Sequence, residues 1–417
     1  MLRVMLWWMI TGLIAGCAAG LENGKHMQMT ASQALNDLER LGRNLYFDAS
    51  LSSPPGQSCA TCHDPAAGWT GPKAEINQGG AVYPGAVHDR FGNRKPPSAA
   101  YATPSPVLHY DAEEQLFVGG NFWDGRATGW LLGEPAAEQA QGPFLNPAEQ
   151  NLADAATLVE KVCASAYGDQ LKSFYGTGIC NNVIDAYNAI GQAIFAYENS
   201  AELNAFSSKY DYFLRDPQKY PLTDQELLGL KLFEDGDRGK CAECHPSAPG
   251  EDGAPPLFTD FSYDNLGLPK NPENPTYRMP RELNPDGAAW IDRGLGGFLA
   301  GVPRFAHLAD RNQGRHKVPT LRNVDRRPQP DFVKAFGHNG VFKSLKEIVH
   351  FYNTRDVLPD CAATPEAKPG QNCWATPEVA ANLNTEELGN LKLTEAEELA
   401  IVAFLQTLND GWVPLVK

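Results

Sequence analysis

Two short stretches of this sequence each place a pair of cysteines directly before a histidine. The residues are Cys59, Cys62 and His63 in SCATCHDPAAGW, and Cys241, Cys244 and His245 in KCAECHPS. This C-x-x-C-H order is typical of c-type haem attachment, in which both thiols bond covalently to the porphyrin and the histidine ligates the iron. A four-cysteine zinc site needs its cysteine pairs much closer in sequence, and a thioredoxin-like motif has no need of the histidines. We therefore predict two covalently bound haem c groups, with His63 and His245 as proximal iron ligands.

The elements that must position these motifs also occur twice. Each motif follows a short segment with helical periodicity, and a longer helical segment closes each half of the chain. The leading segments are 41–48 and 228–235, and the closing segments are 182–200 and 393–408. The last of these begins with a capping box formed by Thr394 and Glu397. Helix, attachment loop and closing helix thus repeat, which predicts a mainly α fold of two cytochrome c-like domains, each with one haem.

Long loops connect these helices, since the chain contains 32 prolines and 39 glycines among 417 residues. The stretch 249–303 is loop-rich and indicates an insertion in the second domain, and the domain boundary falls near 201–222. The predicted organisation is a signal peptide at 1–16, a linker at 17–29, an N-terminal haem domain at 30–210 and a C-terminal haem domain at 211–417.

The first residues, MLRVMLWWMITGLIAGC, indicate an export signal. One arginine precedes an apolar run that is too short to span a bilayer easily. Ile14, Ala15 and Gly16 before Cys17 are typical of a bacterial lipoprotein, in which the cysteine is acylated; the alternative is an ordinary signal cut after Ala19. We expect an exported protein in the periplasm, or attached to the outer membrane or cell surface of a Gram-negative bacterium by a lipid anchor only.

Four of the nine cysteines belong neither to the signal nor to the two motifs. They form two pairs that are close in sequence, and disulfides persist in exported chains. A bridge that closes a loop of about 15 residues contributes ~3 kcal/mol in the chain-entropy model. We predict the disulfides Cys163–Cys180 and Cys361–Cys373, with free buried thiols as the alternative.

The formal net charge of −15 excludes some classes of partner. A strongly acidic chain does not favour nucleic acid or other polyphosphate ligands, and it leaves room for a basic protein partner. With 42% hydrophobic residues, the chain is able to form a sizeable core.

Beyond these features, the chain resembles the bacterial dihaem cytochrome c peroxidase and MauG family over nearly all of its length after the signal. The resembling segments are SCATCHDPAAGW, NFWDGRA (121–127), EQAQGPFLNPAE (138–149), KCAECH, VPTLRNV (318–324) and FGHNGVFKSLKEIVHFYN (336–353). The resemblance implies two haems, hydrogen peroxide as the oxidant and a redox partner protein.

The resemblance implies a role for three residues around the N-terminal haem. Trp123 matches a tryptophan that lies between the two haems, where an indole can relay oxidising equivalents. Gln139 and Glu149 match two polar residues above the open face of the iron, and an insertion at 128–136 separates them from the tryptophan. A carboxylate there can shuttle a proton, and an amide can orient the peroxide. The alternatives are a core tryptophan and a glutamate that stabilises a helix N-terminus.

One departure from conventional cytochrome c peroxidases concerns the N-terminal haem. Those enzymes have a histidine cap shortly after the first motif, whereas residues 75–83 read EINQGGAVY and contain no histidine. The nearest histidines are His88 and His109. We expect an open, five-coordinate iron that peroxide can reach, with His88 as a cap in the alternative.

A second departure concerns the C-terminal haem. The position of its distal methionine, counted from His338 in FGHNG, falls on Tyr352, and MauG-type proteins have tyrosine there. A phenolate oxygen favours ferric and higher oxidation states, so we predict Tyr352 as the distal ligand. In the alternative, Tyr352 is a core residue, and Met279 or nothing ligates the iron. The resemblance also implies that His338, Arg322 and Asn323 lie near the haem propionates and the interdomain region.

The family often binds one calcium ion between its domains, and the sequence leaves this site open. Asn93 or Lys95 falls near one ligand position, and the stretch 328–336 carries an insertion near another.

Taken together, the resemblance implies an oxidoreductase. Peroxide reacts at the N-terminal haem, and oxidising equivalents pass through Trp123 to the C-terminal haem to oxidise a partner protein. The tyrosine favours this MauG-like function over a conventional cytochrome c peroxidase, which reduces peroxide with electrons from a small cytochrome or copper protein. A non-enzymatic dihaem electron carrier is a second alternative, but it has no use for the polar pair Gln139 and Glu149.

Overall fold

A computed structural model of the protein describes residues 35–251 and 253–414. The predicted signal peptide, Cys17 and the linker at 17–29 lie outside these described residues. Within the described part of the chain, no helix is both long enough and apolar enough to cross a membrane. We call residues 35–210 the N-terminal half and residues 211–414 the C-terminal half.

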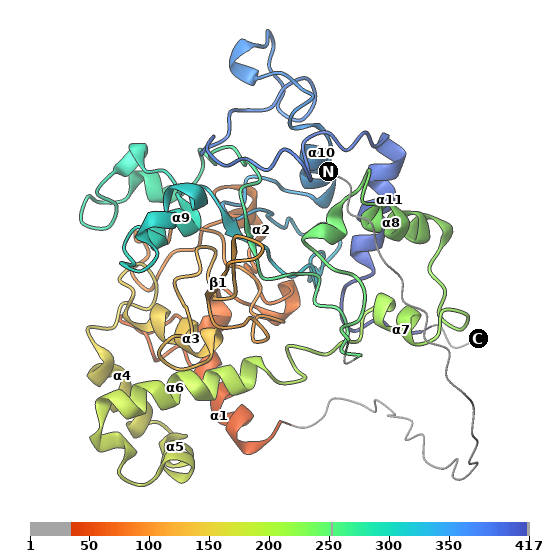
Figure 1. The fold of residues 1–417 in the computed structure, drawn as a ribbon. Coiled ribbons are helices and arrows are strands. Elements are labelled where there is room, and N and C mark those ends of the chain that lie inside the picture. The colour runs from red at the N-terminus through yellow and green to blue at the C-terminus, as the bar shows by residue number, and fades with distance from the viewer. Residues whose placement is uncertain (1–34, 252, 415–417) are drawn as a thin grey trace, which may run out of the picture. The chain divides into compact units, whose positions relative to one another are not determined.

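Helices dominate the regular structure, which confirms the prediction of a mainly α fold with long loops (Figure 1). The α-helices are α1 (Asp37–Phe47), α2 (Ala74–Gln78), α3 (Pro135–Leu145), α4 (Ala155–Ala164), α5 (Gly168–Tyr175), α6 (Val183–Glu198), α7 (Lys209–Arg215), α8 (Asp224–Glu234), α9 (Gly294–Leu299), α10 (Leu345–Thr354) and α11 (Glu395–Gln406). Short 3-10 helices are η1 (Cys59–Thr61), η2 (Pro65–Ala67), η3 (Ile179–Asn181), η4 (Cys241–Glu243), η5 (Pro275–Arg278), η6 (Gly287–Ala289), η7 (Ala306–Leu308), η8 (Asp310–Asn312) and η9 (Cys361–Ala363).

The described strands are short and form two antiparallel pairs. One pair is a hairpin of β1 (His109–Asp111) and β2 (Leu116–Val118), in which Tyr110 faces Phe117. In the other, β3 (Tyr263–Asp264) pairs with β4 (His316–Lys317), so that residues far apart in sequence lie side by side.

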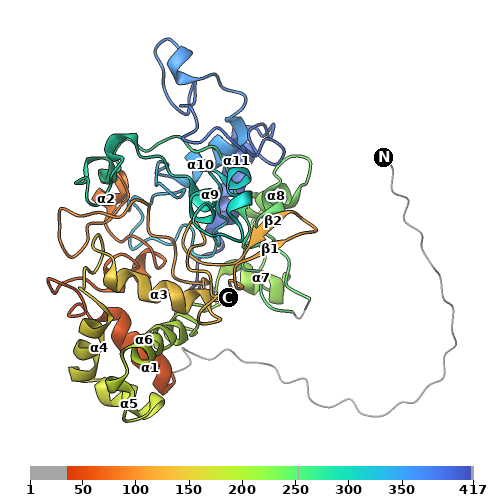
Figure 2. The same ribbon diagram turned by 60° about the vertical axis from the view of Figure 1, so that its left-hand side comes forward.

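The four helical segments expected from the sequence are α1, α6, α8 and α11. The helix α1 packs against α6, and α8 packs against α11 (Figure 1, Figure 2). The predicted capping box of α11 is present, with Thr394 accepting from the backbone of Glu397. Equivalent capping boxes begin α1 and α8. The duplication seen in the sequence therefore extends to how α1 and α8 begin and to the helices that they pack against.

One glycine in each half explains how closely the paired helices approach. A Cβ atom added to Gly42 in α1 would lie 1.9 Å from the carbonyl oxygen of Ala193 in α6. A Cβ atom added to Gly229 in α8 would lie 1.9 Å from the carbonyl oxygen of Ala400 in α11. No larger residue fits at either crossing without moving the helices apart.

Each helix pair belongs to its own hydrophobic core. The core of the N-terminal half contains Leu41, Leu45, Tyr46, Ile190, Ile194 and Tyr197. The core of the C-terminal half contains Leu230, Phe233, Phe351, Ile401 and Phe404. The sequence did not anticipate a third, smaller core. In this core, the β1–β2 hairpin of the N-terminal half packs against the 249–303 stretch. Its members include Leu108, Phe117, Tyr263, Leu295 and Leu299.

Both predicted disulfides are present. Cys163 at the end of α4 bonds to Cys180 in η3, and Cys361 in η9 bonds to Cys373. The remaining described cysteines are the four of the two C-x-x-C-H motifs, and none of them is in a disulfide.

Candidate functional site

The first C-x-x-C-H motif opens into a cavity of about 220 Å³, which we call the first cavity. Cys59, Cys62 and His63 line it together with Trp123, Gln139 and Glu149. The first motif begins in the 3-10 helix η1, which turns the chain so that both thiols and the imidazole face the same space. The structure thus brings all of the predicted N-terminal site residues to one cavity.

The second motif opens into a cavity of about 200 Å³, the second cavity. The 3-10 helix η4 turns the chain here in the same way as η1 does in the first half. The predicted site residues that line this cavity are Cys241, Cys244, His245, Arg322, His338 and Tyr352.

The histidines of the two C-x-x-C-H motifs are oriented alike. The Nδ1 atom of His63 lies 3.2 Å from the carbonyl oxygen of Trp69, and Nδ1 of His245 lies 2.7 Å from the carbonyl oxygen of Phe258. A carbonyl only accepts, so each Nδ1 carries the proton and each Nε2 keeps its lone pair for another ligand. Burial lowers the pKa of His63 to about 4 and also lowers that of His245, which keeps both imidazoles neutral.

This donor set fits a covalently bound haem in each cavity. Two thiols outside any disulfide and a neutral imidazole with an available Nε2 face the same apolar space. These are the groups that c-type attachment requires.

Glu149 and Gln139 supply polar groups to the first cavity from different elements. Gln139 lies on α3, and Glu149 lies in the turn after α3, where its backbone N–H donates to the carbonyl of Asn146 over 3.0 Å. Burial raises the pKa of Glu149, while the nearby charge of Arg126 and a hydrogen bond from the Asn146 side chain act in the opposite direction. The carboxyl group is therefore poised to exchange protons closer to neutral pH than an exposed glutamate.

The insertion at 128–136 is held by one carboxylate on α3. The backbone N–H groups of Gly129, Leu131 and Leu132 all donate to Glu138, over 2.7, 2.6 and 2.9 Å respectively. The inserted loop therefore folds back on the helix that carries Gln139 and does not enter the first cavity.

Tyr352 lies on α10 and points its side chain toward the second cavity. Within the described part of the chain, its hydroxyl group has no hydrogen-bond partner. Burial raises the pKa of Tyr352 above its ordinary value, and the nearby Cys244, Cys241 and Asp264 add to this effect. Met279, the alternative ligand, lines neither cavity, and its sulfur accepts a hydrogen bond from the backbone of Phe91 over 3.3 Å.

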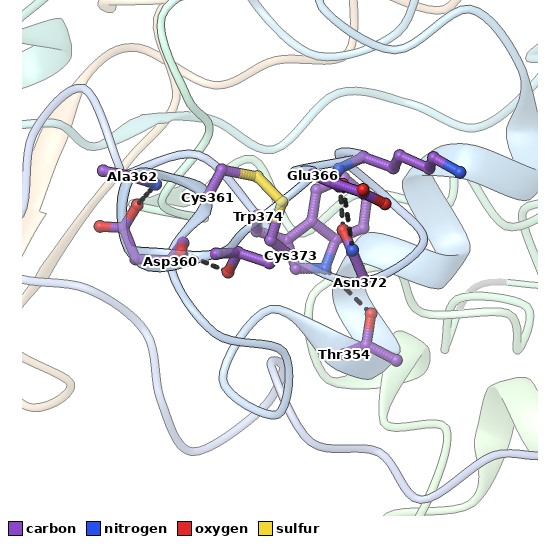
Figure 3. The surroundings of a disulfide bond; sticks show 10 residues. Thr354, Asp360, Cys361, Ala362, Glu366, Asn372, Cys373 and Trp374 are labelled. Atoms are coloured by element: carbon purple, nitrogen blue, oxygen red, sulfur yellow. Dashed lines mark hydrogen bonds between the residues drawn. A yellow bond between two sulfur atoms is a disulfide. The ribbon is translucent and has the colours of Figure 1, made fainter.

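A disulfide loop supports the helix that carries Tyr352. In Figure 3, Trp374 follows Cys373 and reaches Thr354 at the end of α10, with Nε1 donating to the threonine hydroxyl over 3.0 Å. The Trp374 ring also packs edge-on against Phe351, with 5.0 Å between the ring centres. The Cys361–Cys373 bridge closes the loop that presents this tryptophan.

Trp123 lines both cavities. Its side chain is 8% exposed, and its indole N–H donates to the carbonyl of Lys95 over 2.8 Å. The ring of His338 lies 6.4 Å away, centre to centre. The indole of Trp123 therefore lies at the boundary between the space next to His63 and the space next to Tyr352, together with Lys95 and Lys317, which also line both cavities.

Around His338, the structure forms a buried ion-pair network that the sequence analysis missed. The ring of His338 stacks on His316 at 3.5 Å, and Nε2 of His316 lies 3.2 Å from a carboxylate oxygen of Asp292. Arg94 donates to both oxygens of Asp292, over 2.6 and 2.7 Å, and also pairs with Asp124 at 2.7 Å. These charged groups come from distant loops, and neither spacing nor periodicity indicated their meeting.

Arg322 and Asn323 have structural partners. The Arg322 guanidinium group donates to both carboxylate oxygens of Asp211, over 3.0 and 2.9 Å, and to the carbonyl of Pro256 over 2.7 Å. Asn323 donates to Asp410 over 2.8 Å. Arg322 still lines the second cavity, but most of its donors bind protein groups.

Neither histidine considered as a cap lines the first cavity. His88 and His109 are both exposed, and Nδ1 of His109 lies 2.9 Å from the carbonyl oxygen of Val107. Among the described residues, His63 is the one histidine that lines this cavity.

Further residues of the cavities were not singled out from the sequence. Arg126 lines the first cavity, and its presence in the NFWDGRA segment could have marked it. Glu198, the last residue of α6, also lines the first cavity and is 5% exposed. Lys317 lines both cavities and donates to the Ser105 hydroxyl over 2.9 Å. Only the tertiary structure places Glu198 and Lys317 there.

Comparison with known proteins shows the family to which this chain is similar. A family model described as di-haem cytochrome c peroxidase matches residues 36–219. The chain is 35% identical to methylamine utilization protein MauG of Paracoccus denitrificans (strain Pd 1222), over 93% of this chain and 93% of that protein. It is 24% identical to cytochrome-c peroxidase IdrP2 of Denitromonas iodatirespirans, over 95% of this chain and 88% of that protein.

A solved structure is similar over most of the fold. The diheme peroxidase BthA from Burkholderia thailandensis E264 is 32% identical to this chain, with a TM-score of 0.73, covering 91% of this chain and 88% of that chain. The chain therefore belongs to the dihaem cytochrome c peroxidase and MauG family, and it is a dihaem enzyme of the peroxidase or MauG type.

Proposed function

We propose that this protein uses hydrogen peroxide as oxidant in the first cavity and that oxidising equivalents pass through Trp123 to the second cavity, where they serve to oxidise a partner protein. The observation that carries this proposal is the position of Trp123, whose side chain lines both cavities. The relative named MauG and the solved diheme peroxidase support the class of reaction.

Each cavity holds one covalently bound haem in this proposal. The haem-binding residues are Cys59, Cys62 and His63 in the first cavity and Cys241, Cys244 and His245 in the second. When bound, the haem supplies the iron and the conjugated ring that make the oxygen–oxygen bond of peroxide reducible.

Glu149 moves the proton that peroxide cleavage requires. Its carboxyl group accepts a proton from one peroxide oxygen and returns it to the other, which leaves as water. The pKa of Glu149 is raised by burial, so the group takes up and releases protons closer to neutral pH. The Gln139 amide lines the same cavity and orients the peroxide for this transfer.

Trp123 divides one long electron transfer into two shorter ones. The hydrogen bond from its indole N–H to the Lys95 carbonyl fixes the orientation of the ring between the cavities. The reduction of one peroxide to two water molecules consumes two electrons and two protons. Loss of two electrons and two protons by the partner protein balances this reaction.

In this proposal, the phenol oxygen of Tyr352 would hold the iron of a haem bound in the second cavity. Burial raises the pKa of the phenol, so its anionic form requires a compensating positive charge such as ferric iron. Such a ligand would stabilise ferric and higher oxidation states over the ferrous state, so a haem held there would store oxidising equivalents for a partner rather than act as a ferrous electron donor. This preference supports the MauG-like function.

A conventional cytochrome c peroxidase is the second candidate, because the relative IdrP2 carries the name cytochrome-c peroxidase. In that function, a small cytochrome or copper protein supplies the two electrons, and no partner residue is modified. Sustained peroxide consumption with such a reduced donor supports this second candidate over the first.

We also propose that the protein is exported to the periplasm. Two disulfides in one chain persist in an oxidising compartment. The net charge of −15 suits a basic redox partner. Lipid anchoring at Cys17 stays a prediction.

Stopped-flow mixing of the haem-loaded protein with peroxide tests the proposed function. We expect Glu149→Gln to slow the first spectral change by about 100-fold, because the proton transfer loses its carrier. We expect Trp123→Phe to keep the first change fast but to delay the oxidation of the second haem, because the relay is lost.

Two variants serve as matched controls. Glu160→Gln changes an exposed glutamate on α4, and Trp290→Phe changes a tryptophan that lines neither cavity. Both should react with peroxide at the wild-type rates. Wild-type kinetics in Glu149→Gln contradict the proton role, and simultaneous oxidation of both haems in Trp123→Phe contradicts the relay.

A further inference from the structure

The junction between the two halves contains a lysine whose ammonium group is surrounded by carbonyl oxygens. Nζ of Lys334 donates to Ala67, Asn323 and Arg326, over 2.9, 3.2 and 2.9 Å respectively. The Lys334 side chain is 4% exposed. Ala67 follows the first C-x-x-C-H motif, whereas the other two acceptors belong to the C-terminal half, so Lys334 ties the halves together.

Lys334 lies within the stretch 328–336, where the family resemblance suggested one side of a calcium site. Backbone carbonyls are ligands that calcium prefers, but the cation at their centre here is a side chain of the protein. The three surrounding acceptors need three N–H donors, and an ammonium group has three.

The electrostatics of this junction also disfavour a second cation. Burial and the neighbouring cations Lys95, Arg327 and Arg326 lower the pKa of Lys334, while Asp325 opposes them. The three carbonyl acceptors favour the charged form, and we take Lys334 as an ammonium ion. A divalent ion beside Lys334 and Lys95 would meet two like charges in a buried region.

At the other expected ligand positions, the backbone carbonyl of Asn93 is engaged and Lys95 is a cation. The carbonyl of Asn93 accepts a hydrogen bond from the Asn274 side chain over 2.8 Å. Nζ of Lys95 donates to the Pro96 carbonyl over 3.0 Å and to the Thr70 hydroxyl over 3.3 Å. The residues present at these positions therefore do not fit a calcium ion.

We infer that the ammonium group of Lys334 takes the structural place of a calcium ion, so that this protein holds its two halves together without bound calcium. The consequence reaches both cavities. Lys334 lines the second cavity, and the neighbouring Lys95 lines both and accepts the indole hydrogen bond of Trp123 through its carbonyl. The inference concerns this junction and does not depend on the proposed peroxide chemistry.

Metal analysis and thermal unfolding of the purified dihaem protein test this inference. We expect less than stoichiometric calcium in the protein, and no change of the haem spectra or melting temperature when a calcium chelator or calcium is added. One bound calcium per chain, together with a lower melting temperature in chelator, overturns the inference.

A variant tests the role of the ammonium group directly. Lys334→Met keeps the length of the side chain but leaves three buried carbonyls without their donor, so we expect the melting temperature to fall by about 5 °C or more. The haem spectrum of the second cavity should change as well. An unchanged melting temperature shows that the ammonium group has no structural role and contradicts the inference.

Lys343 offers a matched control. Its Nζ donates to the carbonyls of Asn77, Gly79 and Gly340, over 2.7, 2.6 and 2.6 Å, and it lines neither cavity. We expect Lys343→Met to lower the melting temperature and to leave the haem spectra unchanged. A spectral change of equal size in both variants shows that loss of stability alone causes it and contradicts the specific role of Lys334.

Discussion

At the scale of single residues, two carboxyl groups line the first cavity with different surroundings. Glu149 lies near Arg126 and receives a hydrogen bond from Asn146, and both lower a pKa that burial raises. Glu198 lies at the end of α6, and within the described residues no group forms a hydrogen bond with its carboxyl. Burial alone raises the pKa of Glu198 to about 8. In the first cavity, neighbouring groups therefore stabilise the ionised form of Glu149. No such groups offset the effect of burial on Glu198, which resists ionisation.

This difference predicts a pH-dependent stability that Glu198→Gln removes. The pKa of Glu198 rises from 4.5 to about 8 on folding. Between these values the folded state keeps a proton that the unfolded state releases. The contribution of Glu198 to the free energy of unfolding is therefore full below pH 4.5 and is lost as the pH rises through 8. Glutamine does not titrate, so the free energy of unfolding of the variant should vary less over this window.

Urea unfolding of the haem-loaded protein at several pH values measures this effect. The difference in free energy of unfolding between Glu198→Gln and the wild type should grow as the pH rises. It should reach roughly a few kcal/mol. Glu160→Gln on the exposed face of α4 should retain the wild-type pH dependence. Parallel pH curves for wild type and Glu198→Gln would rule out a neutral buried acid at this position.

At the scale of elements, the helix α10 presents Tyr352 and depends on a disulfide loop outside it. The ring of Trp374 packs on Phe351, and its N–H donates to Thr354. The Cys361–Cys373 bridge lies directly next to this tryptophan (Figure 3). The position of Tyr352 thus depends on a covalent link that the helix itself does not contain.

Replacing both Cys361 and Cys373 by serine should therefore have two effects. The free energy of unfolding should fall by about 3 kcal/mol, because the open loop gains conformational freedom in the unfolded state. The optical and EPR signals of the second haem should also change, because Trp374 no longer holds α10 in place. Denaturant titration and spectroscopy of the oxidised protein measure these effects.

The other disulfide is the matched control for this experiment. Cys163 and Cys180 are separated by 17 residues, against 12 for the other pair, so their loss should reduce stability by a similar amount. Their bridge lies in the N-terminal half, and the signals of the second haem should not change. Equal spectral changes in both double variants would show that the loop has no specific effect on Tyr352.

At the scale of the whole molecule, one arginine connects loops of both halves. Arg94 donates to both oxygens of Asp292 in the 249–303 stretch and pairs with Asp124, the residue after Trp123. All three side chains are largely buried. Trp123 is therefore next to an ion-pair network that joins loops of both halves.

Arg94→Met should reduce the free energy of unfolding by about 3–5 kcal/mol, because it leaves the buried carboxylate of Asp292 without its arginine partner, while Asp124 keeps its ion pair with Arg126 at 2.9 Å. In comparison, Arg43→Met breaks an exposed pair with Glu202 and should cost about 1 kcal/mol or less. Denaturant titration of both variants provides the measurement. A cost for Arg94→Met no larger than that for Arg43→Met contradicts the structural role of the network.

Local patterns in the sequence were sufficient for part of this protein. The helices α1, α6, α8 and α11, the capping box at Thr394 and both disulfides were predicted because each depends on residues that are near one another in sequence. The two C-x-x-C-H motifs could be recognised for the same reason. The third core could not, because a β-hairpin and an insertion far along the chain form it together.

The sequence by itself determined the two C-x-x-C-H motifs, the duplicated helices and the disulfide pairs, since short-range geometry and covalent chemistry specify them. Only the tertiary structure decided that Trp123 lines both cavities, that Glu198 faces the first cavity and that the carbonyls around Lys334 come from both halves. These arrangements depend on how distant segments pack, because burial and hydrogen bonding across the halves, and not residue spacing, bring the groups together.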